Sequence, residues 1–304
     1  MPSQQRVSWI GLGRMGTPMA RFILQAGYPL TVWSRSPASR RGLVADGAAE
    51  AASAGECAAA ADVIFCSVSD DAALAEVALG AQGVLARAPR GTIFAEASTV
   101  SAEISAQIAR EAQARGIEYL RMPISGNAAS ARTGNVTVLV SGPAQAWVRA
   151  KPIVETFSKA QVYLGPGEEA RYMKLVVNAL IVNFAQSMAE ALALGRKAGL
   201  DWNVMLDTLA ESTLGSPWLK VKAGLLKQRD FSPTMTTRLI LKDIDLMLAA
   251  ARTHEVPMPL TANTRQLMQM AVGAGYGEDD YMAAIKLAEQ QAGLIDLPSR
   301  DSKT

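Results

Sequence analysis

The sequence has few of the side chains on which metal and disulfide chemistry depend. Among 304 residues there are two cysteines, Cys57 and Cys66, and one histidine, His254. This set is too small for the usual Cys/His zinc sites, and the apolar, cytosol-like surroundings of both cysteines argue against a disulfide framework. No metal site is therefore predicted, and any acid–base chemistry has to come from other groups.

The chain also lacks an excess of charge of either sign. Thirty Lys and Arg residues stand against 28 Asp and Glu residues, which gives a formal net charge of +2. Nucleic acid and anionic membrane surfaces are therefore not expected as partners. The polar start, Met1–Arg6, lacks a signal-peptide pattern, and no uninterrupted apolar run reaches about 18 residues. We expect a soluble, cytoplasmic protein with no membrane span.

Up to about residue 160, short β-branched or apolar runs alternate with longer segments of helical period. This alternation is typical of βαβ units around a mostly parallel sheet. The strands expected from it are Val7–Ile10, Leu30–Trp33, Val63–Val68, Thr92–Glu96, Glu118–Leu120, Val136–Ser141 and Ala160–Leu164. The helices expected between them include Met15–Ala26, Ser36–Asp46 and Ser101–Arg115.

After Gly165-Pro166-Gly167 the strand-like runs end, and segments rich in Ala, Leu and Met follow. We interpret their Met and Leu stripes as helix core and subunit contacts, so a homodimer or homotetramer is expected. The sequence thus predicts a doubly wound α/β domain at residues 1–165, an all-α substrate and oligomerisation domain at 166–295, and a flexible tail at 296–304. The expected helices of the second domain are Glu168–Gly199, Asn203–Ser212, Pro217–Lys227, Thr234–His254, Pro259–Ala274 and Tyr281–Ala292.

A glycine-rich turn follows the first expected strand and opens a helical segment. It reads Gly11-Leu12-Gly13-Arg14-Met15-Gly16. In this setting the first glycine makes a tight turn, the second admits a pyrophosphate, and the third lets the helix pack on the strand. The amides at the helix N-terminus then face the phosphates. The first domain is therefore predicted to be of the Rossmann type and to bind a dinucleotide, the alternative being a structural glycine turn.

The end of the second expected strand indicates which dinucleotide this is. An NAD enzyme usually has an acidic residue there, for the ribose 2′-hydroxyl, whereas this chain reads Ser34-Arg35-Ser36, with Arg40 and Arg41 further on. An arginine between two hydroxyls suits a 2′-phosphate. NADP(H) is therefore the preferred cofactor, and NAD(H) stays open because Arg35 could instead stack on adenine without discriminating between the two.

A lysine and an asparagine stand one helical turn apart in an otherwise apolar segment. Lys174 and Asn178 are four residues apart, so both project from one face of a helix. Burial disfavours the charged form of a lysine, which suits it to general acid–base catalysis near neutral pH. The alternative is a lysine that extends its ammonium group out of an interface. His254, late in another helix, is expected to cap or cover a helix end.

Four motifs in order resemble the β-hydroxyacid dehydrogenase family, which includes 3-hydroxyisobutyrate dehydrogenase and tartronate semialdehyde (2-hydroxy-3-oxopropionate) reductase. They span nearly the whole chain. The motifs are the glycine-rich turn, Met122-Pro123-Ile124-Ser125-Gly126, Gly165-Pro166-Gly167 with Lys174 and Asn178, and Leu241-Lys242-Asp243.

The resemblance implies a role for each matching position. Lys174 would be the general acid/base and Asn178 would orient substrate or lysine. Ser125 and Gly126 would hold the substrate carboxylate and polarise the reacting oxygen, which makes Ser125 a catalytic residue as well. Thr99 and Lys242 would contact the nicotinamide half of the cofactor, with Asp243 placing Lys242 or the substrate. The segment Ser67-Val68-Ser69 would lie over the cofactor. Apart from the family, Ser98-Thr99 also predicts a helix N-cap, and Lys242-Asp243 could be a solvated charge pair.

Three positions depart from the family pattern: Arg121 replaces a common Asp, Asn127 a second Gly, and Met235 stands near a usual aromatic residue. We expect Asn127 and Met235 to contact substrate, Trp218 to be pocket wall or core, and Arg121 to be either part of the site or a surface ion pair. The expected activity is NADP(H)-preferring interconversion of a short β-hydroxy acid and its aldehyde or keto form. Alternatives are an imine reductase-like enzyme, a phosphogluconate-type dehydrogenase and a non-catalytic NADP-binding sensor or scaffold.

Overall fold

The structure, a computed structural model, describes residues 5–294. The chain divides into two compact units, and the boundary falls between Val177 and Asn178, inside the 29-residue helix α9 (Glu169–Lys197). The segment Gly165-Pro166-Gly167 leads into this helix. The tail expected at 296–304 lies outside the described residues.

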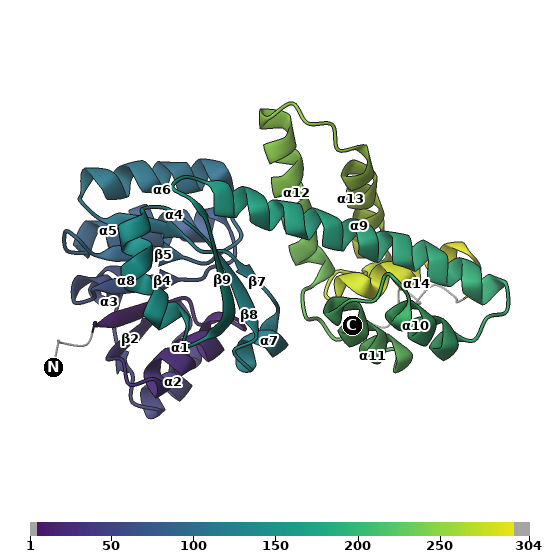
Figure 1. The fold of residues 1–304 in the computed structure, drawn as a ribbon, viewed down its shortest axis with the longest axis horizontal. Coiled ribbons are helices and arrows are strands. Elements are labelled where there is room, and N and C mark those ends of the chain that lie inside the picture. The colour runs from purple at the N-terminus through teal and green to yellow at the C-terminus, as the bar shows by residue number, and fades with distance from the viewer. Residues whose placement is uncertain (1–4, 295–304) are drawn as a thin grey trace. The chain divides into compact units, whose positions relative to one another are not determined.

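The first unit is built on a nine-stranded sheet (Figure 1). The strand order is β3-β2-β1-β4-β5-β6-β8-β7, and β9 pairs with β8. Strands β1 to β6 pair with one another in parallel, whereas β8 runs antiparallel to β6 and β7 and parallel to β9. The strands are β1 (Val7–Ile10), β2 (Leu30–Trp33), β3 (Ala49–Glu50), β4 (Val63–Cys66), β5 (Ile93–Glu96), β6 (Glu118–Arg121), β7 (Ile124–Ser125), β8 (Val136–Ser141) and β9 (Ser158–Gly165).

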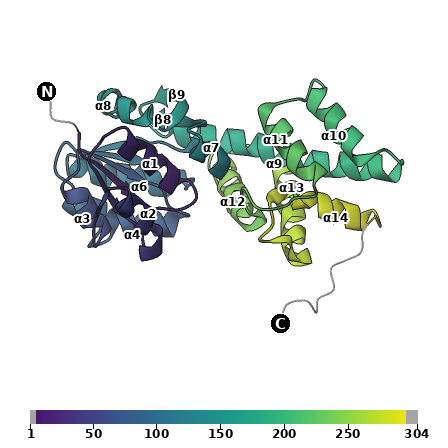
Figure 2. The ribbon, with the colours of Figure 1, turned by 90° about the horizontal axis from the view of Figure 1, so that it is seen from below.

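Helices cover both faces of this sheet, as the alternation of buried side chains along the strands requires. In β1, Trp9 packs into one core layer and Ile10 into the other. The first layer includes residues of α1, α2, α7 and α8, and the second residues of α3 to α6. Figure 2 shows α8 beside β8 and β9. These helices are α1 (Gly16–Gln25), α2 (Arg41–Ala45), α3 (Ala54–Ala59), α4 (Asp71–Leu79), α5 (Val84–Arg87), α6 (Ala102–Ala114), α7 (Ala128–Arg132) and α8 (Ala144–Val154), with a short 3-10 turn η1 (Pro37–Ser39).

The predicted doubly wound sheet is confirmed, and each of the seven predicted strands is present. Strands β3 and β7 were not predicted, because each has two residues. Two residues are too few to show a period of two. The unpredicted strand β7 bears on the site, because it contains Ser125 of the expected substrate segment.

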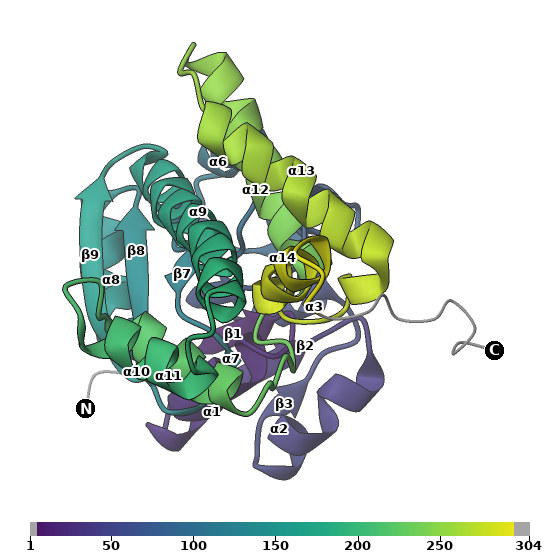
Figure 3. The same cartoon turned by 90° about the vertical axis from the view of Figure 1, so that its right-hand side faces the viewer.

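The second unit is helical, and its helices pack around one core that includes Val182, Ile240 and Met268. Figure 3 shows α12 and α13 lying side by side. The helix predicted at Pro217–Lys227 has the same bounds in the structure. The helix predicted to begin at Thr234 begins at Thr237, because Thr236 is its N-cap. The elements are α10 (Trp202–Glu211), α11 (Pro217–Lys227), α12 (Thr237–Thr253), α13 (Pro259–Ala271), the π-helical turn η2 (Val272–Tyr276), the 3-10 turn η3 (Tyr281–Ala283) and α14 (Ala284–Gln291).

Within the described residues, α9 is long and apolar enough to cross a membrane by length and composition. This is a weak indication, because the core helix of a soluble protein passes the same test. Val182, Ala185 and Leu192 of α9 are buried in the core of the helical unit. Packing thus accounts for part of the apolar character of α9, while Leu180 and Leu194 are exposed.

Candidate active site

The glycine turn after β1 is held tightly at its ends and is open in its middle. Gly11 has φ +90°, and a Cβ added there would lie 2.0 Å from the carbonyl oxygen of Ser67. A Cβ on Gly16 would lie 2.1 Å from the Gly11 carbonyl oxygen, whereas one on Gly13 would meet no atom within 4 Å. Gly11 and Gly16 therefore let the backbone pack closely, while the side of Gly13 on which a Cβ would stand is open.

Hydrogen bonds from neighbouring strands fix the conformation of this turn. The carbonyl oxygen of Gly11 accepts from the hydroxyl of Ser67 at 2.9 Å and from the indole N–H of Trp9 at 3.1 Å. Met15, the N-cap of α1, makes no side-chain hydrogen bond to that helix. The first turn of α1 thus has no side-chain cap of its own, which is the arrangement that suits an anionic ligand.

Of the arginines that follow β2, Arg35 is exposed, and it makes no hydrogen bond or ion pair within residues 5–294. Arg40, by contrast, pairs with Glu50 at 2.9 Å and donates to the carbonyl oxygen of Ala51 at 3.0 Å. Arg40 is therefore already engaged by the protein. Arg35, beside Ser34 and Ser36, and the exposed Arg41 are the guanidinium groups after β2 that could meet a phosphate.

The other predicted cofactor segments follow strands of the same parallel sheet. Ser67-Val68-Ser69 follow β4, and Ser98 and Thr99 follow β5. The strand order changes direction between β1 and β4. Open α/β sheets bind their ligands outside the carboxyl ends of the strands at such a point. The topology thus brings the glycine turn and both segments to one edge.

The predicted substrate segment Ser125–Asn127 joins β7 to α7. Ser125 is half-buried, and a Cβ added to Gly126 would lie 2.7 Å from the hydroxyl oxygen of Ser130. The Asn127 side-chain oxygen caps α7, accepting from the amides of Ala129 and Ser130 at 3.0 Å each. The cap therefore uses the side-chain oxygen of Asn127, and the NH₂ group is the part of this side chain that could contact a substrate.

Lys174 is 9% exposed on α9. One turn later and 5% exposed, Asn178 donates from Nδ2 to Oδ2 of Asp243 at 2.7 Å. The Lys242 ammonium lies 3.1 Å from the other oxygen of Asp243, Oδ1, which accepts no hydrogen bond in the described residues. Asp243 therefore holds both Asn178 and Lys242, two residues that lie more than 60 positions apart in the sequence.

Arg121 forms a buried ion pair rather than a surface one. It is 7% exposed, pairs with Glu168 just before α9, and lies over the ring of Tyr119 with 4.8 Å to the ring centroid. Its charge is therefore balanced within the fold. The expectation of a surface ion pair is wrong, because Glu168 reaches Arg121 inside the unit.

The remaining residues noted in the sequence lie in the helical unit. Trp218 packs on Phe184 with ring centroids 5.6 Å apart and donates to the hydroxyl of Tyr281 at 2.9 Å. Met235 is half-buried against the same core, and its carbonyl oxygen accepts from the amide of Tyr281 at 3.1 Å. His254 is the C-cap of α12. Trp218 is therefore half-buried against the core of the helical unit, and His254 ends a helix as expected.

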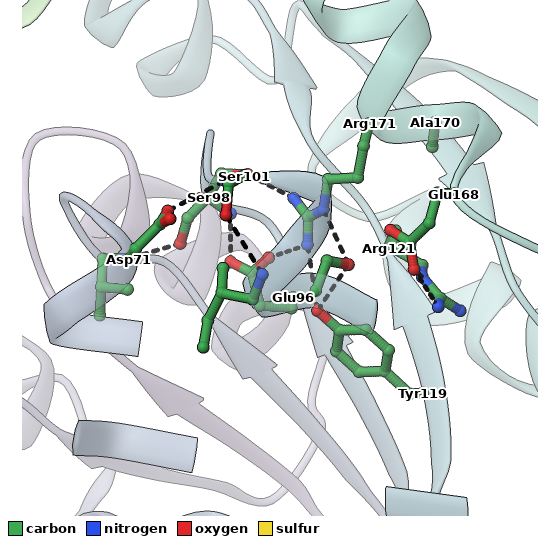
Figure 4. A network of polar contacts seen from close by, with 12 residues as sticks. Asp71, Glu96, Ser98, Ser101, Tyr119, Arg121, Glu168, Ala170 and Arg171 are labelled. Carbon is green, nitrogen blue, oxygen red and sulfur yellow. Dashed lines mark hydrogen bonds and ion pairs between the residues drawn. The ribbon is translucent and has the colours of Figure 1, made fainter. Parts of the chain in front are cut away.

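Sequence reasoning missed the most deeply buried charged cluster of the sheet unit, which Figure 4 shows. Arg171 of α9, 2% exposed, forms an ion pair with Glu96 at the end of β5, 0% exposed. The position of Arg171, three residues before Lys174 in an apolar helix, is the only sign of it in the sequence. Its partner lies 75 residues away, beyond the reach of local patterns.

Both cysteines are buried thiols without ligand geometry. Burial raises the pKa of Cys57 to about 12 and that of Cys66 well above its ordinary value. Among residues 5–294, no group of three or more His, Cys, Asp or Glu side chains is arranged to hold a metal ion.

A parallel sheet with a glycine turn at its switch point, followed by a helical unit, defines a class of NAD(P)-dependent oxidoreductases. Two family models match the chain: the NAD binding domain of 6-phosphogluconate dehydrogenase over residues 6–165, and the NAD-binding domain of NADP-dependent 3-hydroxyisobutyrate dehydrogenase over residues 169–288. The chain belongs to the 3-hydroxyisobutyrate dehydrogenase family of β-hydroxyacid dehydrogenases, NAD(P)-dependent enzymes that act on CH–OH groups.

Relatives cover nearly the full chain. The NAD-dependent L-serine dehydrogenase of Pseudomonas aeruginosa is 31% identical over 95% of this chain and 99% of its own, and the 3-hydroxyisobutyrate dehydrogenase of the same organism is 32% identical over 87% and 91%. The crystal structure of 3-hydroxyisobutyrate dehydrogenase from Salmonella typhimurium matches with a TM-score of 0.84, 28% identity, and coverage of 93% of this chain and 100% of that one.

Proposed function

We propose that this chain is an NADP(H)-preferring enzyme that interconverts a short β-hydroxy acid and its aldehyde or keto form. One observation carries the proposal: Lys174 is buried on α9, one turn before Asn178, whose side chain is fixed by Asp243. A buried lysine beside an oriented amide is suited to exchange a proton with a substrate hydroxyl or carbonyl oxygen.

Lys174 is the proton carrier of the proposed reaction. When bound, the nicotinamide cofactor gives or takes the hydride. In the reducing direction Lys174 donates a proton to the oxygen that was the carbonyl, and in the oxidising direction it takes the proton of the hydroxyl. Asn178 orients the substrate or the lysine, and Asp243, held against Lys242 at 3.1 Å, keeps that asparagine and that lysine in place.

The substrate acid is assigned to the segment after β6. The Ser125 hydroxyl and the backbone at Gly126 hold the carboxylate, because a glycine there leaves the amides accessible. Asn127, through its NH₂ group, and Met235 contribute to substrate choice. The departures from the family pattern at these two positions support a substrate other than 3-hydroxyisobutyrate or tartronate semialdehyde.

The preference for NADP(H) rests on Arg35. It is exposed, unpaired within the described residues and flanked by Ser34 and Ser36, while no carboxylate ends β2. Gly11, Leu12, Gly13, Arg14, Met15 and Gly16 would hold the pyrophosphate, and Ser67, Val68, Ser69, Thr99 and Lys242 the nicotinamide half. One relative is named NAD-dependent, so the family as a whole does not decide this point.

We further propose a cytoplasmic homodimer or homotetramer, with residues 1–165 binding the cofactor and 166–295 serving substrate and assembly. Exposed apolar side chains on α9, among them Leu180 at 70% and Leu194 at 72%, support an interface between copies. Neither nucleic acid nor membrane is proposed as a partner.

The function is tested by NADP⁺-linked oxidation of a panel of short hydroxy acids, hydroxy sulfonates and amino alcohols, followed by NADPH formation at 340 nm. Turnover of at least one β-hydroxy acid, with lower kcat/KM for the matched amino alcohol, is the expected result. Tight NADPH binding without turnover of any member would instead indicate a non-catalytic binding protein.

A further inference from the structure

Arg171 joins α9 to four residues of the sheet unit at once, which lie in β5, the loop after β5, α6 and β6. Its Nη1 donates to the carbonyl oxygen of Ser98 at 2.6 Å, its Nη2 to the hydroxyl of Tyr119 at 3.1 Å, and its Nε to the hydroxyl of Ser105 at 3.3 Å. The guanidinium also pairs with the Glu96 carboxylate (Figure 4). Each side of the planar guanidinium is thereby directed at a fixed partner.

Glu96 fixes the segment expected to contact the nicotinamide. Its Oε1 accepts from the amide of Ser98 at 2.5 Å, and the hydroxyl oxygen of Ser98 accepts from the amide of Val68 at 2.7 Å. The residue after Ser98 is Thr99. The segments that follow β4 and β5 are therefore tied to each other and, through Arg171, to the helix of Lys174.

We propose that Glu96 and Arg171 are positioning residues that set Lys174 relative to the segment containing Thr99. Arg171 lies three residues before Lys174 on α9, so its ion pair with Glu96 fixes the turn of the helix from which Lys174 projects. Misplacement of a reacting group by about 1 Å can reduce turnover by about 100-fold. The inference rests on the proposed role of Lys174.

Two further contacts show that the start of α9 is anchored to the sheet. Arg121 of β6 pairs with Glu168, and the hydroxyl of Ser141 in β8 donates to the carbonyl oxygen of Gly167 at 2.8 Å and accepts from the amide of Ala170 at 3.1 Å. These contacts hold the beginning of the helix. Of the contacts named here, the Glu96–Arg171 pair lies nearest in sequence to Lys174, and Arg171 also binds the Ser98 carbonyl oxygen next to Thr99.

Positioning can be separated from a merely structural role, because a buried ion pair often contributes little to stability when both partners become apolar. The test variant is Glu96→Met with Arg171→Met. The control is Glu289→Met with Arg229→Met, which removes a buried carboxylate and one of its two arginine partners, the other being Arg196, from the helical unit. Melting temperature, NADPH dissociation constant and kcat are measured for both double variants.

For the Glu96/Arg171 variant we expect kcat to fall about 10- to 100-fold, with the NADPH dissociation constant within about threefold of wild type, since the glycine turn and Arg35 are untouched. The control is expected to keep kcat within about twofold. A folded Glu96/Arg171 variant with wild-type kcat would overturn the inference, as would an equal loss of kcat in the control.

Conservative single variants decide the matter if the double variant does not fold. Arg171→Lys keeps the charge but not the fork of donors, and Glu96→Asp shortens the carboxylate arm; each is expected to lower kcat more than it raises KM. Unchanged kcat in both overturns the inference. Lys174→Met is measured alongside, and if it stays active the proposed function is wrong. If Lys174→Met is inactive while the Glu96 and Arg171 variants keep wild-type kcat, only the positioning role is wrong.

Discussion

The contrast between Gly13 and Gly16 predicts that stability and cofactor affinity can be separated within one turn. In Gly16→Ala the new methyl group would lie 2.1 Å from the Gly11 carbonyl oxygen, 2.6 Å from the Ser67 hydroxyl oxygen and 2.7 Å from the Trp9 indole nitrogen. Overpacking of this kind costs about 1–3 kcal/mol. At about 2–4 °C per kcal/mol for a unit of this size, the melting temperature falls by about 2–12 °C.

Gly13→Ala behaves in the opposite way. Its methyl group meets no atom within 4 Å, and Gly13 does not have a positive φ. A compatible Gly→Ala change stabilises by about 0.4–1 kcal/mol through the unfolded chain, so the melting temperature stays level or rises slightly. The methyl group nevertheless occupies the space assigned to the pyrophosphate. The NADPH dissociation constant should rise at least ~10-fold, which corresponds to about 1.4 kcal/mol.

The assays are thermal unfolding without cofactor and fluorescence titration with NADPH. Gly224→Ala is the control, because Gly224 lies within α11 of the helical unit and its added methyl group also meets no atom within 4 Å. It is expected to stabilise by up to about 1 kcal/mol and to leave NADPH affinity unchanged. Wild-type affinity in Gly13→Ala, or equal destabilisation by Gly13→Ala and Gly16→Ala, would refute the assignment of the glycine turn.

Three further outcomes follow from the structure. Arg35→Ala should raise the KM for NADPH about 10-fold or more, because one charge-assisted contact to the 2′-phosphate is lost. The KM for NADH should not change, and steady-state kinetics with both cofactors measures the two values. Burial favours protonation of Glu289, but hydrogen bonds from two arginines bring its pKa below the ordinary 4.5. The ionised carboxylate therefore stabilises the fold above about pH 4.5, and this stabilisation is lost as the pH falls through the folded-state pKa. In thermal melts from pH 7 to 3, the higher melting temperature of wild type relative to Glu289→Gln should shrink only below about pH 4.5. Cys57 and Cys66, whose thiol pKa values are raised by burial, should not react with a thiol reagent at pH 8 in the native protein, yet both should react in guanidinium chloride.

Local patterns were sufficient to predict the sheet and most helices. The alternation of short buried strands with helical segments indicated the doubly wound sheet, and the glycine turn indicated its switch point. Helix ends were predicted least well, because they depend on caps such as Thr236, which starts α12 three residues later than hydrophobic periodicity suggests. Strand β7 was missed for a related reason: two residues have no readable period.

The site could be predicted only as a set of motifs, and the contacts between them could not. That Asp243 binds Asn178, or that Glu168 neutralises Arg121, depends on the tertiary fold, since the partners lie 65 and 47 residues apart. The Glu96–Arg171 pair was missed altogether, because a single arginine in an apolar helix does not identify its partner. Asn127 was assigned to the substrate, but its side-chain oxygen is used as a helix cap.

The proposed reaction depends on proton transfer by Lys174, and Lys174→Met removes that proton. Methionine keeps the length and the apolar stem of the side chain and removes the exchangeable proton. With a hydroxy acid that the wild type oxidises, kcat should fall by at least about 100-fold, the size of a general-base contribution, while the NADPH dissociation constant and the melting temperature stay close to wild type. A folded Lys174→Met protein that binds NADPH and retains most of its kcat would contradict the account.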